Sequence, residues 1–355
     1  MTGAGHAALQ AELRDLVREQ IGLEVDRFEA LRGVAGHRRI FRLWLRDGAP
    51  RTLIARVDRG DPPPGVAPEP RLEPLRAFLE AHGLPVPRRL GGNRARDIDL
   101  LEDLGSRELL EAVRGAAPAL RRALYAEACD LVPRLQVLRD PTGRVPSFQR
   151  HYDAALIGGK ARRFAVASLP AGLGRAPSAA EVAVVHEAFA AVAEALVDAP
   201  QRFAHRDFQS TNLMLRDAAP GQRLAMVDFQ GALLAPPEYD LVCLLRGSYV
   251  VLPEEEVREH AERVRPRLPD APDTDIFWRR FDLLTLVRKG KDHALWYELS
   301  ARGRPDALAY AAPTFAYLRG AARRRGAHDV RLARFGALLE EMSPRLAPES
   351  FRCAP

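Results

Sequence analysis

Two polar motifs separated by a short hairpin constrain the fold of this chain more than any other feature. Residues 205–212 have the sequence HRDFQSTN, and residues 228–230 have the sequence DFQ. Between them, two short apolar runs flank a polar turn at 217–221, which is the pattern of a β-hairpin. A hairpin returns the chain to its starting point, so we expect it to bring Asp228 beside Asn212.

These two motifs carry the oxygen groups that phosphoryl transfer requires. The reaction needs a base for the acceptor hydroxyl and hard oxygen ligands for Mg²⁺. We therefore expect Asp207 to be the catalytic base, and Asn212 and Asp228 to be the metal ligands. His205 and Arg206 are expected to support the loop. Isolated Asp and Asn residues often only cap loops, but the complete HRD-x4-N spacing with a following Asp-Phe favours the functional interpretation.

The segment 1–104 predicts a small α+β unit. A helix is expected at 7–20, and a second helix at 71–82 should follow the third of five strands. The five expected strands are 25–31, 39–46, 52–57, 88–90 and 98–101. Beyond this segment the pattern is helical except around 203–240. We therefore predict a nucleotide-binding N-lobe at 1–104 and a catalytic and acceptor-binding C-lobe at 105–355.

The third strand offers a candidate contact to the phosphates of a nucleotide. Arg56 lies where a basic strand residue would reach them, and it would pair with a glutamate of the following helix. Glu73 is the preferred partner, and Glu69 is the other candidate. The alternative interpretation is an ordinary exposed arginine on the surface of the sheet.

Two further segments are candidates for nucleotide contacts. The loop that contains Gly36 and Arg38 would cover the phosphates with backbone N–H groups, although a plain β-turn explains its glycines as well. The run LLEDLG at 100–105 has the form of a hinge between lobes. There the main chain around Glu102 and Leu104 would contact adenine.

Composition and charge argue against several classes of protein. A hydrophobic content of 47% with 28% charged residues is typical of globular proteins. No apolar run approaches the roughly 20 residues of a membrane span, and no secretory signal core is visible. The net charge of +6 comes mainly from arginines interleaved with acidic residues, which does not indicate nucleic-acid binding. The scattered cysteines suggest reduced thiols, so we expect a cytoplasmic monomer without membrane or nucleic-acid partners.

The two motifs, with the segment PPEYDL at 236–241, resemble the aminoglycoside-phosphotransferase/choline-kinase superfamily. The resemblance covers nearly the whole chain. It implies an α+β, bilobal, protein-kinase-like fold with a small antiparallel-sheet N-lobe and a mostly helical C-lobe. It also implies ATP and Mg²⁺ as cofactors. By this resemblance Asp207 is catalytic, Asn212 and Asp228 bind the metal, and Asp240 braces the active-site loop.

Within that superfamily the chain is most similar to the N-acetylmuramate/N-acetylglucosamine anomeric kinases of peptidoglycan recycling. The similar segments are 35–42, 100–105, 228–232, 281–284 and 317–318. One departure concerns a helix beside the sugar, where these kinases usually have a glutamate and this chain has Lys160. The pattern around 287–297 also differs. Lys160, Gln209 and Arg288 are our candidates for acceptor contacts.

The resemblance implies an ATP-dependent kinase that phosphorylates the anomeric hydroxyl of an N-acetyl amino sugar. An aminoglycoside O-phosphotransferase, or another hydroxyl kinase, is one alternative. Its cationic substrates call for an acidic pocket, whereas the C-lobe offers Arg288, Lys289 and Lys291. A nucleotide-binding pseudokinase scaffold without turnover is the other alternative. The complete set of motif residues argues against it, and Arg56 in place of the usual lysine argues for it.

Overall fold

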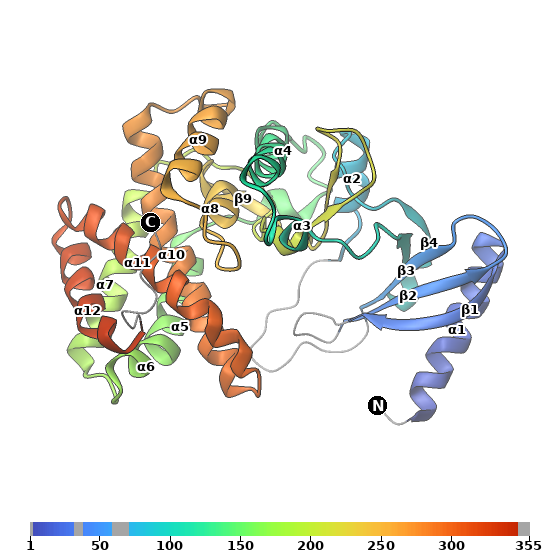
Figure 1. Ribbon diagram of the computed structural model, residues 1–355, viewed down its shortest axis with the longest axis horizontal. Coiled ribbons are helices and arrows are strands. Elements are labelled where there is room, and N and C mark those ends of the chain that lie inside the picture. Colours follow the sequence, from blue (N-terminus) through green and yellow to red (C-terminus); the bar gives the residue numbers. More distant parts are fainter. Residues whose placement is uncertain (1–2, 32–37, 59–70, 347–355) are drawn as a thin grey trace. The chain divides into compact units, whose positions relative to one another are not determined.

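The chain forms two compact units (Figure 1). The parts that the computed structural model describes are residues 3–31, 38–58 and 71–346. The first unit contains Met1–Arg107 together with Met214–Gln230, and the second contains the remaining residues. By these internal contacts, the hairpin between the two polar motifs groups with the first unit. The functional boundary between residues 104 and 105 stays a prediction.

A five-stranded antiparallel sheet is the centre of the first unit. Its strand order is β1-β2-β3-β5-β4. The elements are α1 (Gly3–Ile21), β1 (Glu24–Leu31), β2 (Arg39–Arg46), β3 (Thr52–Val57), α2 (Leu75–Ala81), β4 (Arg89–Asn93) and β5 (Ile98–Glu102). The expected strands and the first helix are thus confirmed.

Hydrophobic periodicity explains how α1 and the sheet pack. In β2 the side chains of Phe41, Leu43 and Leu45 alternate with more exposed residues, and these three side chains are buried. Leu13 and Val17 lie four residues apart on one face of α1 and are fully buried in the same core cluster. The helix therefore covers one face of the sheet, and its apolar face closes the core of this unit.

The second helix is shorter than expected. It begins at Leu75 rather than at residue 71, because a proline at position 74 disfavours the helical conformation at Glu73. Its end near Gly83, which has a φ of 69°, agrees with the prediction.

The hairpin between the two polar motifs is confirmed. Strands β7 (Leu213–Leu215) and β8 (Leu224–Met226) form a two-stranded sheet. The backbone N–H of Arg216 donates to the carbonyl of Arg223 at 2.6 Å, and the N–H of Met226 donates to the carbonyl of Pro85 at 2.7 Å. The second bond ties the hairpin to the first unit, immediately before the DFQ motif.

The second unit is mostly helical, as predicted. Its helices are α3 (Leu109–Val113), α4 (Pro118–Gln136), α5 (Ala154–Arg163), α6 (Leu169–Leu173), α7 (Ala179–Ala195), α8 (Tyr239–Leu245), α9 (Glu254–Val264), α10 (Thr274–Ala301), α11 (Ala311–Gly326) and α12 (Val330–Leu346). A π-helical turn, Phe164–Ser168, joins α5 to α6. Two short strands, β6 (Arg202–Ala204) and β9 (Leu233–Ala235), pair antiparallel. Because β6 leads into the HRD motif and β9 leads into α8, this pairing sets the position of the candidate site.

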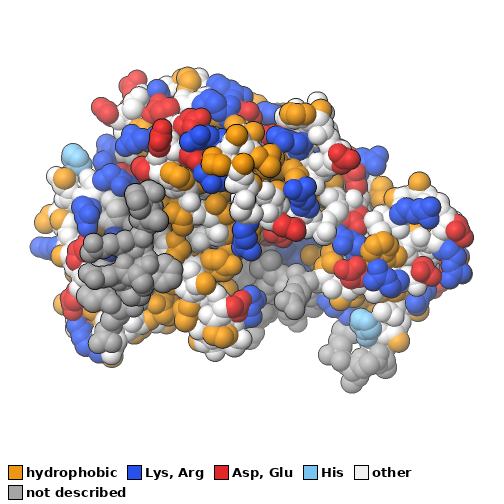
Figure 2. All heavy atoms as spheres, in the orientation of Figure 1, with side chains coloured by type: hydrophobic (Ala, Val, Ile, Leu, Met, Phe, Trp, Pro, Cys, Tyr) orange, Lys and Arg blue, Asp and Glu red, His pale blue; other side chains and the backbone are white. Residues whose placement is uncertain are grey.

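Helix α10 is the centre of the second unit and packs against α5, α8 and α11. Its middle is buried on several sides, which explains why it lacks a single apolar face. Gly290 allows α7 to approach closely, because a Cβ atom there would lie 2.8 Å from Cζ of Phe189. None of the helices in the described ranges has the length and apolar character needed to cross a bilayer. Basic and acidic side chains are mixed over the face shown in Figure 2.

Glu238, next to the start of α8, is a buried carboxyl group with little compensation of its charge. Among the described residues no group donates a hydrogen bond to either carboxyl oxygen, and Nη1 of Arg280 lies 3.7 Å from Oε1. Burial raises the pKa of Glu238 to about 7, and the attraction of Arg280 opposes this rise only in part.

We expect Glu238→Gln to change the pH dependence of stability. The folded protein holds a proton on Glu238 in a range where the unfolded chain, with an ordinary pKa of 4.5, has lost it. Stability from this group is therefore present below about pH 4.5 and is lost as the pH rises through about 7. Relative to Glu238→Gln, the wild type should lose up to about 1.4 kcal/mol of unfolding free energy per pH unit in that window. Urea unfolding at several pH values measures this difference.

The exposed Glu255, in the first turn of α9, provides the matched control. The Glu255→Gln protein should follow the wild-type pH dependence closely. A constant difference between wild type and Glu238→Gln across the same pH range would contradict the assignment of a raised pKa to Glu238.

Candidate active site

The HRD loop is fastened to the start of α8 by one carboxylate. Asp240 accepts the backbone N–H of His205 at 2.7 Å through Oδ2 and that of Arg206 at 3.0 Å through Oδ1. Arg206 has a φ of 78°, an unfavourable conformation for a residue with a side chain. The buried ring of His205 packs edge-on against Phe208, with 5.6 Å between ring centroids. These contacts are what a bracing role for His205, Arg206 and Asp240 requires.

The carboxylate of Asp207, the expected base, lies among positive charges. Oδ1 accepts a hydrogen bond from Nη1 of Arg288 at 2.9 Å, and 30% of the Asp207 side chain is exposed. Burial by itself would raise the pKa of Asp207, but the charges of Arg288, Lys291 and Arg206 outweigh burial and hold the pKa below its ordinary value. Asp207 is therefore ionised at neutral pH, as a proton acceptor must be.

Asn212 has the orientation of a possible metal ligand. Its Nδ2 donates to the backbone carbonyl of Asp207 at 2.8 Å, and its backbone N–H donates to the carbonyl of Gln209 at 2.9 Å. Within the described ranges, no hydrogen bond reaches its Oδ1, so that oxygen is available to a cation. Gln209 is half-buried and its backbone N–H donates to the carbonyl of Asp207 at 3.0 Å, and its contact with the acceptor stays a prediction.

Asp228 follows the hairpin in the first unit. It adopts a left-handed conformation, with a φ of 60°. Its Oδ1 accepts a hydrogen bond from Nε2 of Gln230 at 2.5 Å and lies 3.7 Å from Nη1 of Arg38. The carboxylate is partly exposed, which suits a metal ligand. Because Asn212 and Asp228 belong to different units, their joint binding of one ion stays a prediction.

Arg56 is buried on β3, and its partner is Asp58. Nε donates to Oδ1 at 3.1 Å and Nη2 donates to Oδ2 at 2.6 Å, a bidentate arrangement. Asp58 also forms an ion pair with Arg38, whose Nε lies 3.3 Å from Oδ1 of Asp58. The sequence contained a signal for this pair, because residues i and i+2 of a strand point to the same face. This contact makes the interpretation of Arg56 as an exposed surface arginine wrong.

The expected pair between Arg56 and Glu73 is not formed. Glu73 instead accepts a hydrogen bond from Arg76, and its Oε2 accepts the backbone N–H of Ala77 at 3.1 Å. The described ranges contain no ion pair between Arg56 and Glu73. Glu73 pairs with Arg76 rather than with Arg56 because Arg76 lies only three residues further along the chain, within reach of the carboxylate.

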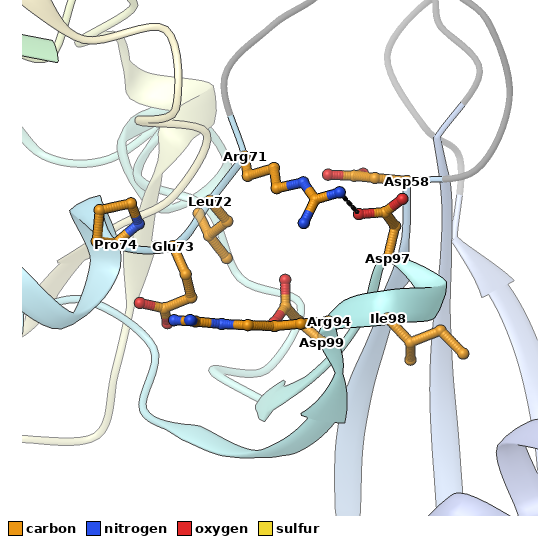
Figure 3. A pocket seen from close by; sticks show the side chains of 9 residues that line it. All are labelled: Asp58, Arg71, Leu72, Glu73, Pro74, Arg94, Asp97, Ile98 and Asp99. Carbon is orange, nitrogen blue, oxygen red and sulfur yellow. Dashed lines mark ion pairs between the residues drawn. The ribbon is translucent and has the colours of Figure 1, made fainter. Parts of the chain in front are cut away.

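A pocket of about 220 Å³ opens beside these residues (Figure 3). Figure 3 shows Glu73 on one side of it and Asp58 on the other. Its lining consists of Asp58, Arg71, Leu72, Glu73, Pro74, Arg94, Asp97, Ile98 and Asp99. Arg71 reaches across to Asp97, with 2.9 Å between Nη2 and Oδ1. Both signs of charge line this pocket, so its charges alone select no ligand.

The segment predicted to be a hinge, 100–105, is held by an arginine whose contacts could not be predicted from the sequence. Arg42 on β2 donates to both carboxylate oxygens of Asp103, at 2.6 and 3.1 Å, and to the carbonyl of Gly105 at 2.8 Å. Glu102 pairs with Arg88 through its backbone N–H and its carboxylate. The half-buried Leu104 therefore lies in a turn fixed on both sides. Gly36, another candidate nucleotide contact, lies outside the described residues.

Lys160 on α5 is buried, with 8% of its surface exposed. Its Nζ donates to the hydroxyl of Tyr152 at 2.9 Å and lies 3.5 Å from the hydroxyl of Tyr239. Burial, followed by repulsion from Arg288 and Lys291, lowers the pKa of Lys160 well below its ordinary value. In the part of the chain that the structure describes, no carboxylate forms an ion pair with it. The neutral form of its amine is therefore favoured, and the two tyrosine hydroxyls are its polar partners.

Comparison with known proteins decides the family. The profile of the phosphotransferase enzyme family (APH) matches residues 31–275, which is more than half of the chain. The chain belongs to this family. It is therefore a phosphotransferase, as its two polar motifs indicate, and the predicted superfamily resemblance is confirmed.

Curated relatives of this phosphotransferase bear the name N-acetylmuramate/N-acetylglucosamine kinase. The relative from Pseudomonas aeruginosa is 29% identical over 314 residues, covering 87% of this chain and 86% of the relative. The relative from Pseudomonas putida is 26% identical over 342 residues and covers 94% of each chain. A third, from Neisseria meningitidis, is 29% identical over 316 residues, covering 87% and 88%.

Solved structures confirm the kinase-like fold. A choline kinase from Streptococcus pneumoniae superposes with a TM-score of 0.59 at 12% identity, over 88% of this chain and 99% of that one. The streptomycin–ATP complex of the aminoglycoside phosphotransferase APH(2")-IIa gives a TM-score of 0.57 at 16% identity, over 84% and 95%. At these identities the likeness shows the fold alone.

We expect Asp240→Ala to loosen the HRD loop. The change leaves the N–H groups of His205 and Arg206 without their acceptor, and a buried unpaired donor costs about 1–3 kcal/mol. Urea unfolding should therefore show a loss of about 2–6 kcal/mol for the two groups together. Hydrogen exchange at these two amides should become faster.

Asp130→Asn is the control, because Asp130 forms partly exposed ion pairs with Arg263 and Arg267. It should cost at most about 1 kcal/mol. If Asp240→Ala were as mild as Asp130→Asn, Asp240 would not be the brace of the loop.

Proposed function

We propose that this phosphotransferase uses ATP to phosphorylate the anomeric hydroxyl of an N-acetyl amino sugar, N-acetylmuramate or N-acetylglucosamine, in peptidoglycan recycling. The observation that carries the proposal is the positive surrounding of Asp207, to which Arg288, Lys291 and Arg206 contribute. The names of the curated relatives supply the class of sugar.

The charge around Asp207 argues against the aminoglycoside alternative. A polycationic acceptor would have to place its hydroxyl, and the ammonium groups near it, beside Arg288 and Lys291. Like charges in a partly desolvated site repel strongly, so the site selects against such acceptors. A neutral sugar meets no such penalty, and a sugar with a carboxylate is attracted.

The basicity of Asp207 also agrees with an anomeric hydroxyl. A carboxylate whose pKa lies below its ordinary value is a weak base, and proton transfer to it is easier from a more acidic hydroxyl. The anomeric hydroxyl of a sugar is more acidic than its other hydroxyls. We infer that Asp207 accepts this proton as the anomeric oxygen bonds to the transferred phosphorus.

The remaining candidates fit a nucleotide and its metal ion. Oδ1 of Asn212 and the carboxylate of Asp228 are oxygen donors of the kind that Mg²⁺ prefers. Arg56 and Arg38 would contact the phosphates, and the backbone of the turn at 102–104 would contact adenine. ATP with Mg²⁺ supplies the phosphoryl group and neutralises its charge. The buried thiols of Cys129 and Cys243 are free, which supports a cytoplasmic enzyme, and we propose that it acts as a monomer.

A panel of acceptors tests the proposal. We expect N-acetylmuramate or N-acetylglucosamine to be consumed with ATP and to lose its reducing-end reactivity. The methyl glycoside of the same sugar should be inert because its anomeric oxygen carries no proton. A phosphorus NMR spectrum of the product should show coupling to the C1 proton.

Asp207→Asn is the matched control, since it retains the shape of the side chain but cannot accept the proton. It should reduce kcat by roughly 10²–10⁴-fold. Phosphorylation of the methyl glycoside, or turnover of kanamycin but of no free sugar, would overturn the proposed acceptor. Undiminished turnover in Asp207→Asn would point to a contaminating kinase or to a different base.

A second prediction concerns the nucleotide. If Arg56 contacts the phosphates, Arg56→Ala should raise the KM for ATP by at least about tenfold, the loss expected for a charge-assisted hydrogen bond. Arg56→Lys should restore ATP binding only in part, because lysine lacks the planar fork that holds Asp58. Steady-state kinetics at varied ATP measures both effects.

Arg46→Ala is the control, because Arg46 is an exposed arginine on β2 that pairs with Asp26 at 3.3 Å. Its KM for ATP should stay at the wild-type value. An unchanged KM in both Arg56 variants would mean that Arg56 serves the sheet and not the nucleotide.

A further inference from the structure

One arginine of α10 holds the expected catalytic base directly. Arg288 is buried, with 3% of its surface exposed, and it lies beside the HRD loop. Its Nη1 donates to Oδ1 of Asp207 at 2.9 Å and to the backbone carbonyl of Arg206 at 3.1 Å. The same nitrogen therefore fixes both the side chain of the base and the peptide group that precedes it.

Arg288 is itself anchored from the opposite end of its guanidinium group. Nε donates to Oδ2 of Asp292 at 3.2 Å, one helical turn along α10. Asp292 also accepts Nζ of Lys289 at 2.8 Å and lies 3.4 Å from Nζ of Lys291. An arginine with polar partners on both sides has little freedom to rotate, so the position of Asp207 is determined by α10.

The contact leaves one oxygen of the base available. Oδ1 of Asp207 is occupied by Arg288, whereas no group in residues 3–31, 38–58 or 71–346 donates a hydrogen bond to Oδ2. Because 30% of the side chain is exposed, Oδ2 is the atom that an acceptor hydroxyl can approach. A base must lie within hydrogen-bond reach of its proton, and small misplacements are costly to the rate.

We propose that Arg288 is a positioning residue, which holds Asp207 by Oδ1 so that Oδ2 faces the acceptor hydroxyl, and that Asp292 fixes Arg288 in this role. The inference rests on the proposed function, because it assumes that Asp207 is the base. It differs from our initial interpretation of Arg288 as an acceptor contact. A positioning residue acts on kcat through Asp207, whereas an acceptor contact acts on the KM of the sugar.

The test measures kcat and both KM values in Arg288→Met, which keeps the volume but loses the charge and the hydrogen bonds. We expect kcat to fall about 10–10²-fold, with the KM values for ATP and sugar changed less than about threefold. Arg288→Lys should recover part of kcat because it restores one donor near Oδ1. Asp292→Asn, which weakens the anchor, should lie between wild type and Arg288→Met.

A double variant gives the decisive comparison. In an Asp207→Asn background the positioned group is already disabled, so adding Arg288→Met should reduce the residual kcat by less than about threefold. Circular dichroism and urea unfolding establish that each variant folds. If Arg288→Met does not fold, kcat of Arg288→Lys and of Asp292→Asn is compared instead, each with and without Asp207→Asn.

Arg324→Met is the matched control. Arg324 is a residue of α11 and forms an ion pair with Asp282, which belongs to α10 as Arg288 does. The change should leave kcat within about twofold of wild type.

Three outcomes would overturn the inference while the wild type still phosphorylates the sugar. These are an unchanged kcat in Arg288→Met, a raised KM for the sugar with kcat intact, and a full additional loss of kcat in the Asp207→Asn background. A wild type that phosphorylates no amino sugar would overturn the proposed function instead. The ratio between variants, measured with whichever acceptor the enzyme turns over, would still test the role of Arg288.

Discussion

The two hydrogen bonds from Asp240 to the HRD loop are the contact on which the candidate site depends. They fix the backbone at His205 and Arg206 immediately before the base. Burial raises the pKa of Asp240 to about 7 even though both backbone donors favour its charged form. The loop is thus held by a carboxylate that is costly to bury. The antiparallel pairing of β6 with β9 delivers both partners, since one strand leads into the loop and the other into α8.

The sequence predicted the helices and strands well because they follow from local patterns. Alternation in β2 and the four-residue spacing in α1 follow from burial of one face, and the HRD and DFQ motifs are visible without a structure. The hydrogen-bond and ion-pair partners of individual side chains were harder to predict, because they depend on how segments distant in the sequence pack together. Asp103 as the partner of Arg42 depends on contacts across the sheet. The error at Glu73 has the opposite cause, since a neighbouring arginine satisfied it locally.

Contacts between a guanidinium group and a carboxylate recur in the candidate site. Arg42 holds the hinge, Arg56 is held by Asp58, and Arg288 holds Asp207. In each case a planar side chain with several donors pairs with a carboxylate, and Arg42 and Arg288 also donate to a backbone carbonyl. The abundance of arginine in this chain therefore has structural consequences beyond net charge. Lysine at any of these three positions would supply the charge but not the fixed geometry.

The π-helical turn at Phe164–Ser168 has a consequence for how relatives are compared with this chain. A π turn contains an additional residue relative to an α turn, and each residue advances an α-helix by about 100°. In a relative with an uninterrupted α-helix, equal counting from the C-terminal end would pair Lys160 with a side chain on a different face. Residues of a relative can therefore be matched to this segment only after the two structures are superposed.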